Sequence, residues 1–254
     1  VIHFAALKSV SESVKYSAKY YYNNVIGSTV LFELVKKNKI QDVIFSSSAT
    51  VYGTPITLPL DEIHPIRATN PYGQNKIDIE NMLLNDSYFN HECCVKILRY
   101  FNPVGAHPSG LIGENPAGIP NNLMPYIVKV AKHEYEKVSV FGNDYNTHDG
   151  TGIRDYIHIM DLVDGHIKSL NYQKKGISIF NLGTGRGYSV LDLIKTFENV
   201  NNVSVPFDIV SRRPGDVASV YTNPHKAESV LGFKAKYSLE DMCRDAWKFA
   251  EIND

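Results

Sequence analysis

Asn70-Pro71-Tyr72-Gly73-Gln74-Asn75-Lys76 is the stretch around which the rest of this 254-residue chain is organised. Pro71 suits the first turn of a helix, and Tyr72 and Lys76 are four residues apart, so both side chains point the same way. An ammonium beside a phenol favours the phenolate and lowers the pKa of the tyrosine. The pair could then exchange a proton with a hydroxyl group. Without further support, such a pair is usually only a surface contact.

Buried strands are expected on both sides of the helix that this stretch opens. The expected elements of this part are strands over 1–6, 43–45 and 95–101, and helices over 11–37, with a break near Tyr16, and over 72–84. This alternation predicts a parallel, doubly wound α/β sheet. Ligands of such sheets bind beyond the carboxyl ends of the strands, where Ser46-Ser47-Ser48 and Tyr100 are expected.

The composition changes after Asn102, because residues 103–120 are rich in proline and glycine and suggest a functional loop or domain crossover. Shorter elements follow, which predict a smaller α/β domain. Helices are expected over 122–133, 160–170, 189–197, 223–231 and from Ser238 onward, and strands over 138–141, 154–158, 178–182 and 205–210.

The overall composition limits the possible partners. Hydrophobic residues make up 43% and charged residues 21%, which is typical of a soluble globular protein. A net charge of -1 provides no general field for nucleic acid or an anionic membrane, so a phosphate ligand needs individually placed arginines. The three cysteines lack zinc spacing and suggest reduced thiols in the cytoplasm. His107 and His158 lack a helical partner, so we expect structural roles and no metal site.

Several ordered stretches carry a family resemblance. They are Val1–Lys8, Ser46–Gly53, Tyr72-x-x-x-Lys76, Arg99–Ala106, Gly118–Tyr126, Phe141–Tyr145 and Asp149–His158. Together they resemble the UDP-glucose 4-epimerase family of extended short-chain dehydrogenases/reductases. The resemblance implies NAD-dependent interconversion of UDP-glucose and UDP-galactose through a 4-keto sugar. It also implies a Rossmann-type sheet that is incomplete in this chain, with a smaller substrate domain.

The resemblance assigns roles to individual residues. Tyr72 matches the base, Lys76 the lysine that binds the nicotinamide ribose, and Ser48 the hydroxyl at the sugar 4-oxygen. The residues matching NAD contacts are Phe4, Lys8, Asn23, Tyr72, Lys76 and Tyr100. The residues matching UDP-sugar contacts are Ser48, Ala49, Thr50, Tyr72, Asn102, Asn122, Leu123, Ser139, Val140, Phe141, Arg154, Arg213, Asp216 and Val220. Among these, Arg154 and Arg213 match pyrophosphate ligands, and Asp216 an acceptor of ribose hydroxyls.

The same resemblance implies the domain organisation. Residues 1–103 with about 156–184 are expected to bind NAD, and residues 104–155 with about 185–254 to bind the UDP-sugar. A cytoplasmic homodimer is expected, with the helices 11–37 and 72–84 forming a four-helix bundle with those of a second subunit.

Two other functions compete with epimerisation. A nucleotide-sugar 4,6-dehydratase also forms a 4-keto sugar, but then eliminates water with an added acid and base, usually an Asp-Glu pair after the strand-end hydroxyl. Ala49 and Thr50 occupy those positions and cannot shuttle protons in that way. A non-catalytic binding protein on the same fold could lose Ser48, Tyr72 or Lys76, yet all three are present.

Val220 bears on substrate range. It follows Asp216 by four residues, where the family places a gate beside the sugar 2-substituent. Valine is smaller than the tyrosine that favours plain hexoses, which suggests activity on UDP-N-acetylhexosamines as well.

The Gly-rich phosphate loop of a dinucleotide-binding fold does not occur in this chain, nor does the acid expected about 20 positions after it. In the family these features precede the strand that begins here, so the chain resembles an epimerase without its N-terminal part. We therefore expect residues 1–254 to hold NAD weakly and to be inactive by themselves. Absorbance and mass spectrometry of the purified chain test this, and tightly bound NAD would contradict it.

Overall fold

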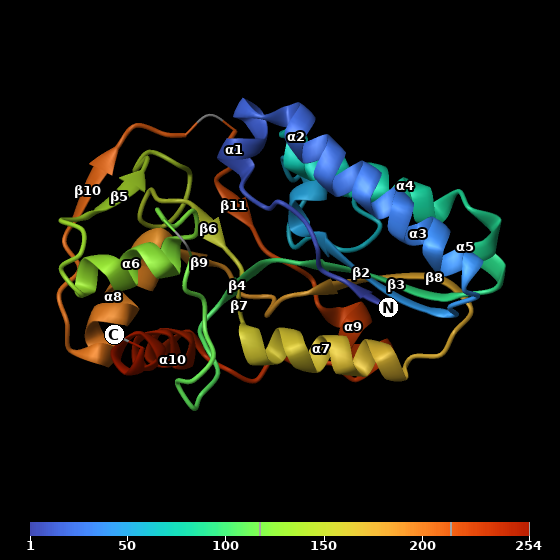
Figure 1. Ribbon diagram of the computed structural model, residues 1–254. Helices are drawn as coiled ribbons and strands as arrows, with labels where there is room; N and C mark the ends of the chain where they lie inside the picture. The colour runs from blue at the N-terminus through green and yellow to red at the C-terminus, as the bar shows by residue number, and fades with distance from the viewer. Residues whose placement is uncertain (117, 214, 254) are drawn as a thin grey trace. The chain divides into compact units, whose positions relative to one another are not determined.

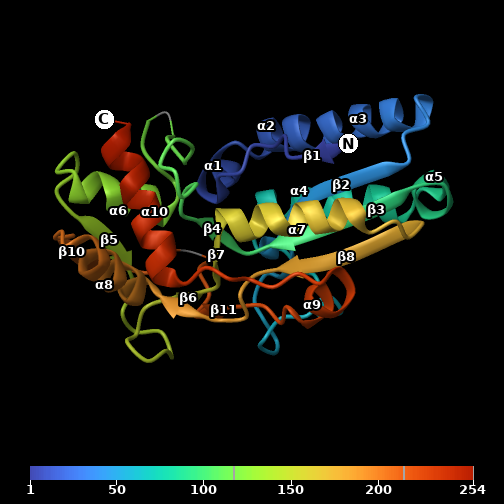
Figure 2. The ribbon, with the colours of Figure 1, turned by 90° about the horizontal axis from the view of Figure 1, so that it is seen from below.

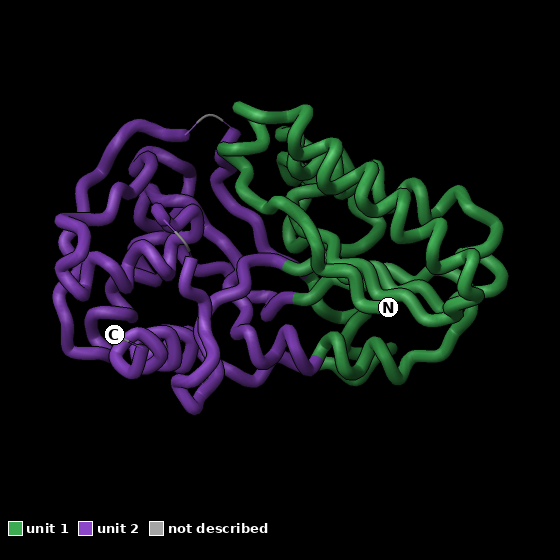
Figure 3. Tube along the Cα trace, viewed as in Figure 1, with its two compact units in different colours: residues 1–100, 165–182, 223–233 green, residues 101–164, 183–222, 234–254 purple. Residues whose placement is uncertain are grey.

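The structure is a computed structural model that describes residues 1–116, 118–213 and 215–253 (Figure 1). Pro214, inside the Arg213–Asp216 motif, lies outside the described residues. The chain divides into two compact units (Figure 3). Unit 1 contains residues 1–100, 165–182 and 223–233, and unit 2 contains residues 101–164, 183–222 and 234–254.

A four-stranded parallel sheet forms the centre of unit 1. Its order is β1 (Ile2–His3), β2 (Asp42–Ser48), β3 (Cys94–Tyr100) and β8 (Gly176–Leu182). The middle strands are buried along almost their whole length, as apolar parallel strands covered on both faces should be. The predicted parallel α/β sheet is therefore confirmed.

Helices cover both faces of this sheet (Figures 1 and 2). One face carries α1 (Val10–Lys15), α2 (Ser17–Tyr21), a π-helical turn (Tyr22–Ile26), α3 (Gly27–Lys37), α4 (Pro71–Leu84) and the short α5 (Ser87–His91). The other carries α9 (His225–Leu231) and the part of α7 (Ile159–Asn171) that follows Asp164. The break predicted near Tyr16 is present, since this residue has φ -129° and ψ 52° between α1 and α2.

Gly73 lets the start of α4 approach the end of β2 closely. A Cβ atom at Gly73 would lie 2.9 Å from the carbonyl oxygen of Thr50 and 2.9 Å from the Cβ of Ala68. Thr50 belongs to a 3-10 turn, Ala49–Tyr52, that follows β2 directly. A glycine at this position therefore places Tyr72 beside the turn that begins after Ser48.

Within its described residues, unit 2 contains three small sheets, three complete helices and the first part of α7. The parallel pairs are β4 (Asn102–Val104) with β7 (Tyr156–His158) and β5 (Val138–Phe141) with β10 (Phe207–Val210). In the third sheet, β6 (Ile153–Arg154) lies between β11 (Ser219–Val220) and β9 (Tyr188–Ser189). The helices α6 (Leu123–Ala131), α8 (Val190–Asn201) and α10 (Leu239–Ile252) share one hydrophobic core with β4, β5 and β7.

Caps fix the ends of two helices in unit 2. Ser189 and Asp192 form a reciprocal capping box at α8, and Ser238 and Asp241 form another at α10. Both serines were predicted to begin helices. The predicted strand 154–158 is instead divided at Asp155, whose buried carboxylate accepts hydrogen bonds from the backbone N–H groups of Thr184, Gly185 and Thr222.

The units differ from the expected domains chiefly in two segments, besides residues 101–103 and 183–184, which lie in unit 2. Residues 223–233 lie in unit 1, because α9 packs on β8 and the Asn223 N–H donates to the Leu60 carbonyl at 2.7 Å. Residues 156–164 lie in unit 2, because β7 pairs with β4.

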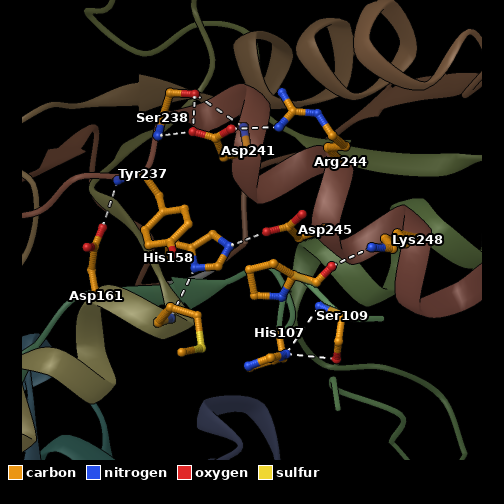
Figure 4. Close-up of polar contacts among 12 residues, drawn as sticks. His107, Ser109, His158, Asp161, Tyr237, Ser238, Asp241, Arg244, Asp245 and Lys248 are labelled. Atoms are coloured by element: carbon orange, nitrogen blue, oxygen red, sulfur yellow. Dashed lines mark hydrogen bonds and ion pairs between the residues drawn. The ribbon is translucent and has the colours of Figure 1, made fainter. Parts of the chain in front are cut away.

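A buried imidazole anchors α10 to β7 within unit 2 (Figure 4). His158 Nδ1 accepts the Met160 N–H at 3.0 Å, so Nε2 carries the hydrogen and donates to Asp245 at 3.1 Å. The ring also stacks on Tyr237, with 4.1 Å between centroids. These contacts give His158 a structural role.

Candidate active site

The start of α4 holds Tyr72 through local contacts. Asn70 caps the helix by accepting the Gly73 N–H at 2.9 Å, and the Tyr72 N–H donates to Ser13 Oγ at 3.2 Å. Pro71 occupies the first turn, as predicted. Lys76 follows one turn later on the same helix.

Lys76 is only 3% exposed, which is unusual for a lysine. Its Nζ donates to the carbonyl of Ser46 at 2.6 Å and lies 5.8 Å from the centre of the Tyr72 ring. Burial lowers the pKa of Lys76 to about 8, although the charge of Glu80 opposes the change. Lys76 therefore remains mainly an ammonium at neutral pH, although its pKa is closer to neutrality than that of an ordinary lysine.

The prediction that Lys76 lowers the pKa of Tyr72 is wrong for this arrangement. Burial raises the pKa of Tyr72 to about 12, with Tyr100 adding to the effect. A hydrogen bond with Ser48 lowers the pKa, but by less than burial raises it. The Lys76 ammonium is directed to a backbone carbonyl and lies over the ring, so the phenol keeps its proton at neutral pH.

Ser48 links the turn after β2 to Tyr72. Its Oγ accepts hydrogen bonds from the Thr50 N–H at 3.2 Å and from Thr50 Oγ1 at 3.0 Å. Because the hydroxyl accepts both bonds, its own hydrogen can be donated to the Tyr72 phenol. Ala49 lies within the same turn and is half-buried.

Tyr100 ends β3 directly beside Ser48, since the two residues are register partners in the sheet. Its hydroxyl is hydrogen-bonded to Ser46 Oγ, and burial raises its pKa. The structure therefore brings Ser48, Tyr72, Lys76 and Tyr100 together at the carboxyl ends of β2 and β3.

The remaining residues that were matched to NAD lie on the segment after β1 and on the π-helical turn. Phe4 is 56% exposed, and its ring centre lies 5.0 Å from that of His166. Lys8 and Asn23 are also exposed. Sequence reasoning missed Asn24, which is buried and binds both the N–H and the carbonyl of Leu7, at 2.8 and 2.9 Å. The adjacent asparagines within a helical segment were the available signal.

In unit 2, Asp216 lies between the two predicted phosphate ligands. Arg213 Nε donates to Asp216 Oδ2 at 3.1 Å, and Arg154 Nη2 lies 3.9 Å from Oδ1. Arg154 also donates to the carbonyl of Val217 at 2.9 Å, and the Arg213 guanidinium lies 4.6 Å from the centre of the Phe141 ring. Val220 is the register partner of Arg154. These five predicted residues form one group.

The other predicted substrate residues of unit 2 lie on other elements and make other contacts. Asn102 is an exposed residue at the start of β4. Asn122 precedes α6 and donates to Glu114 Oε1 at 2.8 Å, while Leu123 is half-buried. Ser139 is exposed in β5, whereas Val140 faces the core and is 1% exposed.

One group in the described ranges has metal-ligand atoms within 4.8 Å of one another, namely His148, Asp149 and Asp192. Its carboxylates already accept local hydrogen bonds, from Thr151 and Ser189. Helix capping and loop closure account for the cluster. None of the helices in the described ranges has the length and hydropathy needed to cross a bilayer.

Comparisons with known proteins cover almost the whole chain. The protein-family model described as GDP-mannose 4,6 dehydratase matches residues 1–246. The UDP-glucose 4-epimerase of Yersinia enterocolitica is 54% identical over 254 residues, covering 100% of this chain and 76% of that protein. The epimerase of Bacillus subtilis strain 168 is 52% identical over 255 residues, covering 100% of this chain and 75% of that protein. The chain belongs to the UDP-glucose 4-epimerase family.

Solved structures of the UDP-glucose 4-epimerase family agree with this placement. The enzyme of Bifidobacterium longum, in complex with NAD+ and UDP, superposes with a TM-score of 0.96 at 48% identity. The match covers 100% of this chain and 76% of that chain. The predicted α/β fold and family are thus both confirmed.

Replacing Lys76 with an uncharged residue tests how much the burial of its charge lowers the free energy of unfolding. The pKa of Lys76 is about 8 in the native state against an ordinary value of 10.5. Between these values the unfolded chain binds more protons than the native one, so the penalty is full below pH ~8 and disappears as the pH rises toward ~10.5. We expect Lys76→Met to raise the free energy of unfolding at pH 7 by about 1–3 kcal/mol.

Urea unfolding at pH 7 and above pH 9 measures the difference in the free energy of unfolding between Lys76→Met and the wild type. This difference should be smaller at the higher pH. Lys37→Met, at an exposed position, is the matched control and should change stability little. A Lys76→Met chain that is less stable than the wild type at pH 7 would contradict the conclusion that the buried ammonium destabilises the native state.

Proposed function

We propose that this chain carries the catalytic residues of an NAD-dependent epimerase that interconverts UDP-glucose and UDP-galactose through a 4-keto sugar. The observation that carries the proposal is the identity of about half of all positions with UDP-glucose 4-epimerases along the entire chain. The meeting of Ser48, Tyr72 and Lys76 at the strand ends supports it, since ligands of doubly wound sheets bind there.

The side chains suit proton transfer at a sugar hydroxyl. Ser48 is hydrogen-bonded to Tyr72, so the 4-hydroxyl proton can pass through Ser48 to the Tyr72 phenolate during oxidation, and the resulting phenol can return that proton to the 4-keto oxygen. The phenol must first lose its own proton, because burial keeps it protonated at neutral pH. An ammonium has three donors, and the carbonyl of Ser46 takes one, so Lys76 has donors to offer to ribose hydroxyls. NAD, when bound, supplies the hydride acceptor for sugar C4.

We assign NAD binding to unit 1 and UDP binding to unit 2. Phe4, Lys8, Asn23 and Tyr100 would contact NAD together with Tyr72 and Lys76. In unit 2, the planar forks of Arg154 and Arg213 suit a diphosphate, and Asp216 suits ribose hydroxyls. The aromatic face of Phe141, beside Arg213, suits a stacked base.

A dehydratase is the second candidate, because the matching family model bears that description. Elimination of water from the 4-keto sugar requires an acid and a base next to the strand-end serine. Ala49 and Thr50 follow Ser48, and the Thr50 hydroxyl already donates to Ser48. The side chains present therefore favour epimerisation.

The homodimer and the cytoplasmic location also belong to the proposal. Tyr22, Ile26, Val30 and Leu34 recur at four-residue intervals and are 74%, 38%, 57% and 50% exposed. Such a stripe suits packing against a second copy's helices. The free cysteines are compatible with a reducing compartment.

The reaction is tested by product analysis. Because the sequence predicts weak NAD binding by residues 1–254 alone, the assay uses a chimera, in which the Gly-rich segment of a family member is fused ahead of Val1. With UDP-galactose we expect NMR to detect UDP-glucose, and Tyr72→Phe to lower kcat about 10²- to 10⁴-fold with NAD still bound. A 4-keto-6-deoxy product would instead identify a dehydratase.

The same chimera tests the role of Val220 in substrate range. We expect it to epimerise UDP-N-acetylglucosamine, and Val220→Tyr to reduce kcat/KM for that substrate at least about tenfold by filling the space beside the sugar 2-substituent. Turnover of UDP-glucose is the internal control and should persist. Normal activity on UDP-glucose without turnover of UDP-N-acetylglucosamine in the unsubstituted chain would reject this role.

A further inference from the structure

A further arginine lies beside the predicted nucleotide-binding group of unit 2. Arg212 immediately precedes Arg213, and both follow β10, the strand that pairs with β5 (Figure 1). Arg212 Nε donates to Asp144 Oδ1 at 2.6 Å, and Arg212 Nη2 donates to the Asp144 carbonyl at 2.6 Å. One guanidinium group therefore binds both the side chain and the backbone of the same residue.

The Arg212 guanidinium also packs on an aromatic ring. It lies 4.1 Å from the centre of the ring of Tyr145, a residue that is only 7% exposed. A Cβ atom at Gly142 would lie 2.7 Å from Arg212 Cγ and 2.8 Å from Tyr145 Cε2. Gly142 also has a φ of 84°, which residues other than glycine rarely adopt. The close packing of Arg212 on Tyr145 therefore depends on glycine at position 142.

Arg212 and Arg213 contact neighbouring parts of the chain at and after the end of β5. Arg213 lies over the ring of Phe141, the last residue of β5, and Arg212 lies over the ring of Tyr145, four residues later. The segment that follows β10 is thus attached to the segment that follows β5 by two adjacent side chains.

These two segments supply the residues of the predicted nucleotide-binding group. The chain at and after β5 supplies Phe141 and, after a loop, Arg154, whereas the chain after β10 supplies Arg213 and Asp216. The pairing of β6 with β11 joins the two segments at Arg154. Arg212 joins them a second time, at the residue next to Arg213.

Geometry, rather than the strength of the ion pair, is what Arg212 contributes. The side chains of Arg212 and Asp144 are 46% and 70% exposed, and exposed ion pairs add little to stability. The planar guanidinium nevertheless holds two acceptors in its plane and a buried ring against its face. A rotation of the Arg212 side chain would break all three contacts together.

We propose that Arg212 is a positioning residue that keeps Arg213 in place to receive the diphosphate of UDP. Arg212 acts through its neighbour and is not a further phosphate ligand, because Asp144 already takes the hydrogen bonds of Nε and Nη2. This inference rests on the proposed function, which assigns UDP binding to unit 2.

Calorimetric titration of UDP into chain 1–254 measures this role without NAD. We expect Arg212→Met to raise the Kd for UDP about 3- to 10-fold, because Arg213 must then be ordered when the ligand binds. Arg212→Lys should raise the Kd similarly, since an ammonium keeps the charge but cannot hold two acceptors in one plane.

Asp144→Ala separates positioning from a simple effect of charge. Removal of an acid near an anionic ligand strengthens binding by electrostatics alone. It would also strengthen binding if the released Arg212 were itself a phosphate ligand. Positioning predicts the opposite result, a Kd raised about 2- to 5-fold. The double variant Arg212→Met with Asp144→Ala should bind UDP no more weakly than Arg212→Met, because both changes break the same contact.

Asp208→Ala is the matched control. Asp208 is another exposed acid of unit 2, lies on β10 and pairs with Lys137 at 2.5 Å. Its removal changes the charge of the protein as Asp144→Ala does, but leaves the contacts of Arg212 intact. We expect the affinity for UDP to stay the same or to rise slightly.

The outcomes distinguish this inference from the proposed function. If the unsubstituted chain does not bind UDP, the assignment of UDP to unit 2 is wrong, and the role of Arg212 fails with it. UDP binding that Arg212→Met leaves unchanged, or that Asp144→Ala strengthens, overturns the positioning role alone.

Kinetics of the active chimera add a readout that a merely structural role would not move. Arg212→Met should raise KM for UDP-galactose by about the same factor as the Kd and leave kcat within about twofold, because the group it positions binds the nucleotide and not the reacting carbon. A loss of kcat at unchanged KM contradicts the proposal.

Discussion

Burial of a charged helix face is the constraint on which the candidate site depends. Helix α4 presents Lys76 and Glu80 to the sheet, where water cannot solvate them. Each buried charge costs several kcal/mol unless it is paired or hydrogen-bonded. Arg99 and Ser47 satisfy Glu80, and the Ser46 carbonyl receives Lys76. These bonds require one register between α4 and the strand ends, and so they also fix where Tyr72 lies.

The same burial explains why the chemistry of Tyr72 departs from the simplest expectation. Desolvation disfavours both the phenolate and the ammonium, so it raises the pKa of Tyr72 to about 12 and lowers that of Lys76 to about 8. The two pKa values thereby move apart. Both groups hold protons at neutral pH, so Tyr72 must lose its proton before it can act as a base.

Sequence patterns correctly predicted the secondary-structure features that depend on residues close by in the sequence. The apolar strands, the break at Tyr16 and the caps at Ser189 and Ser238 depend on nearby residues, and all are present. Features that depend on distant residues were missed. Asp155 divides a predicted strand because it binds loops that lie far along the chain. The sign of the Tyr72 shift likewise depends on tertiary burial, which no local pattern encodes. The roles of the individual site residues stay predictions.

The arginine group of unit 2 follows a different electrostatic principle from the site in unit 1. Arg154 and Arg213 share one carboxylate, Asp216, so the group carries a net charge of about +1 in a chain whose total is -1. The carboxylate weakens the attraction for a diphosphate, but it holds both guanidinium groups near one point. Less side-chain entropy is then lost when a ligand binds. A half-buried acid between a half-buried and an exposed arginine would therefore lower the affinity for a diphosphate but fix the geometry, which would suit a substrate that is released after each turnover.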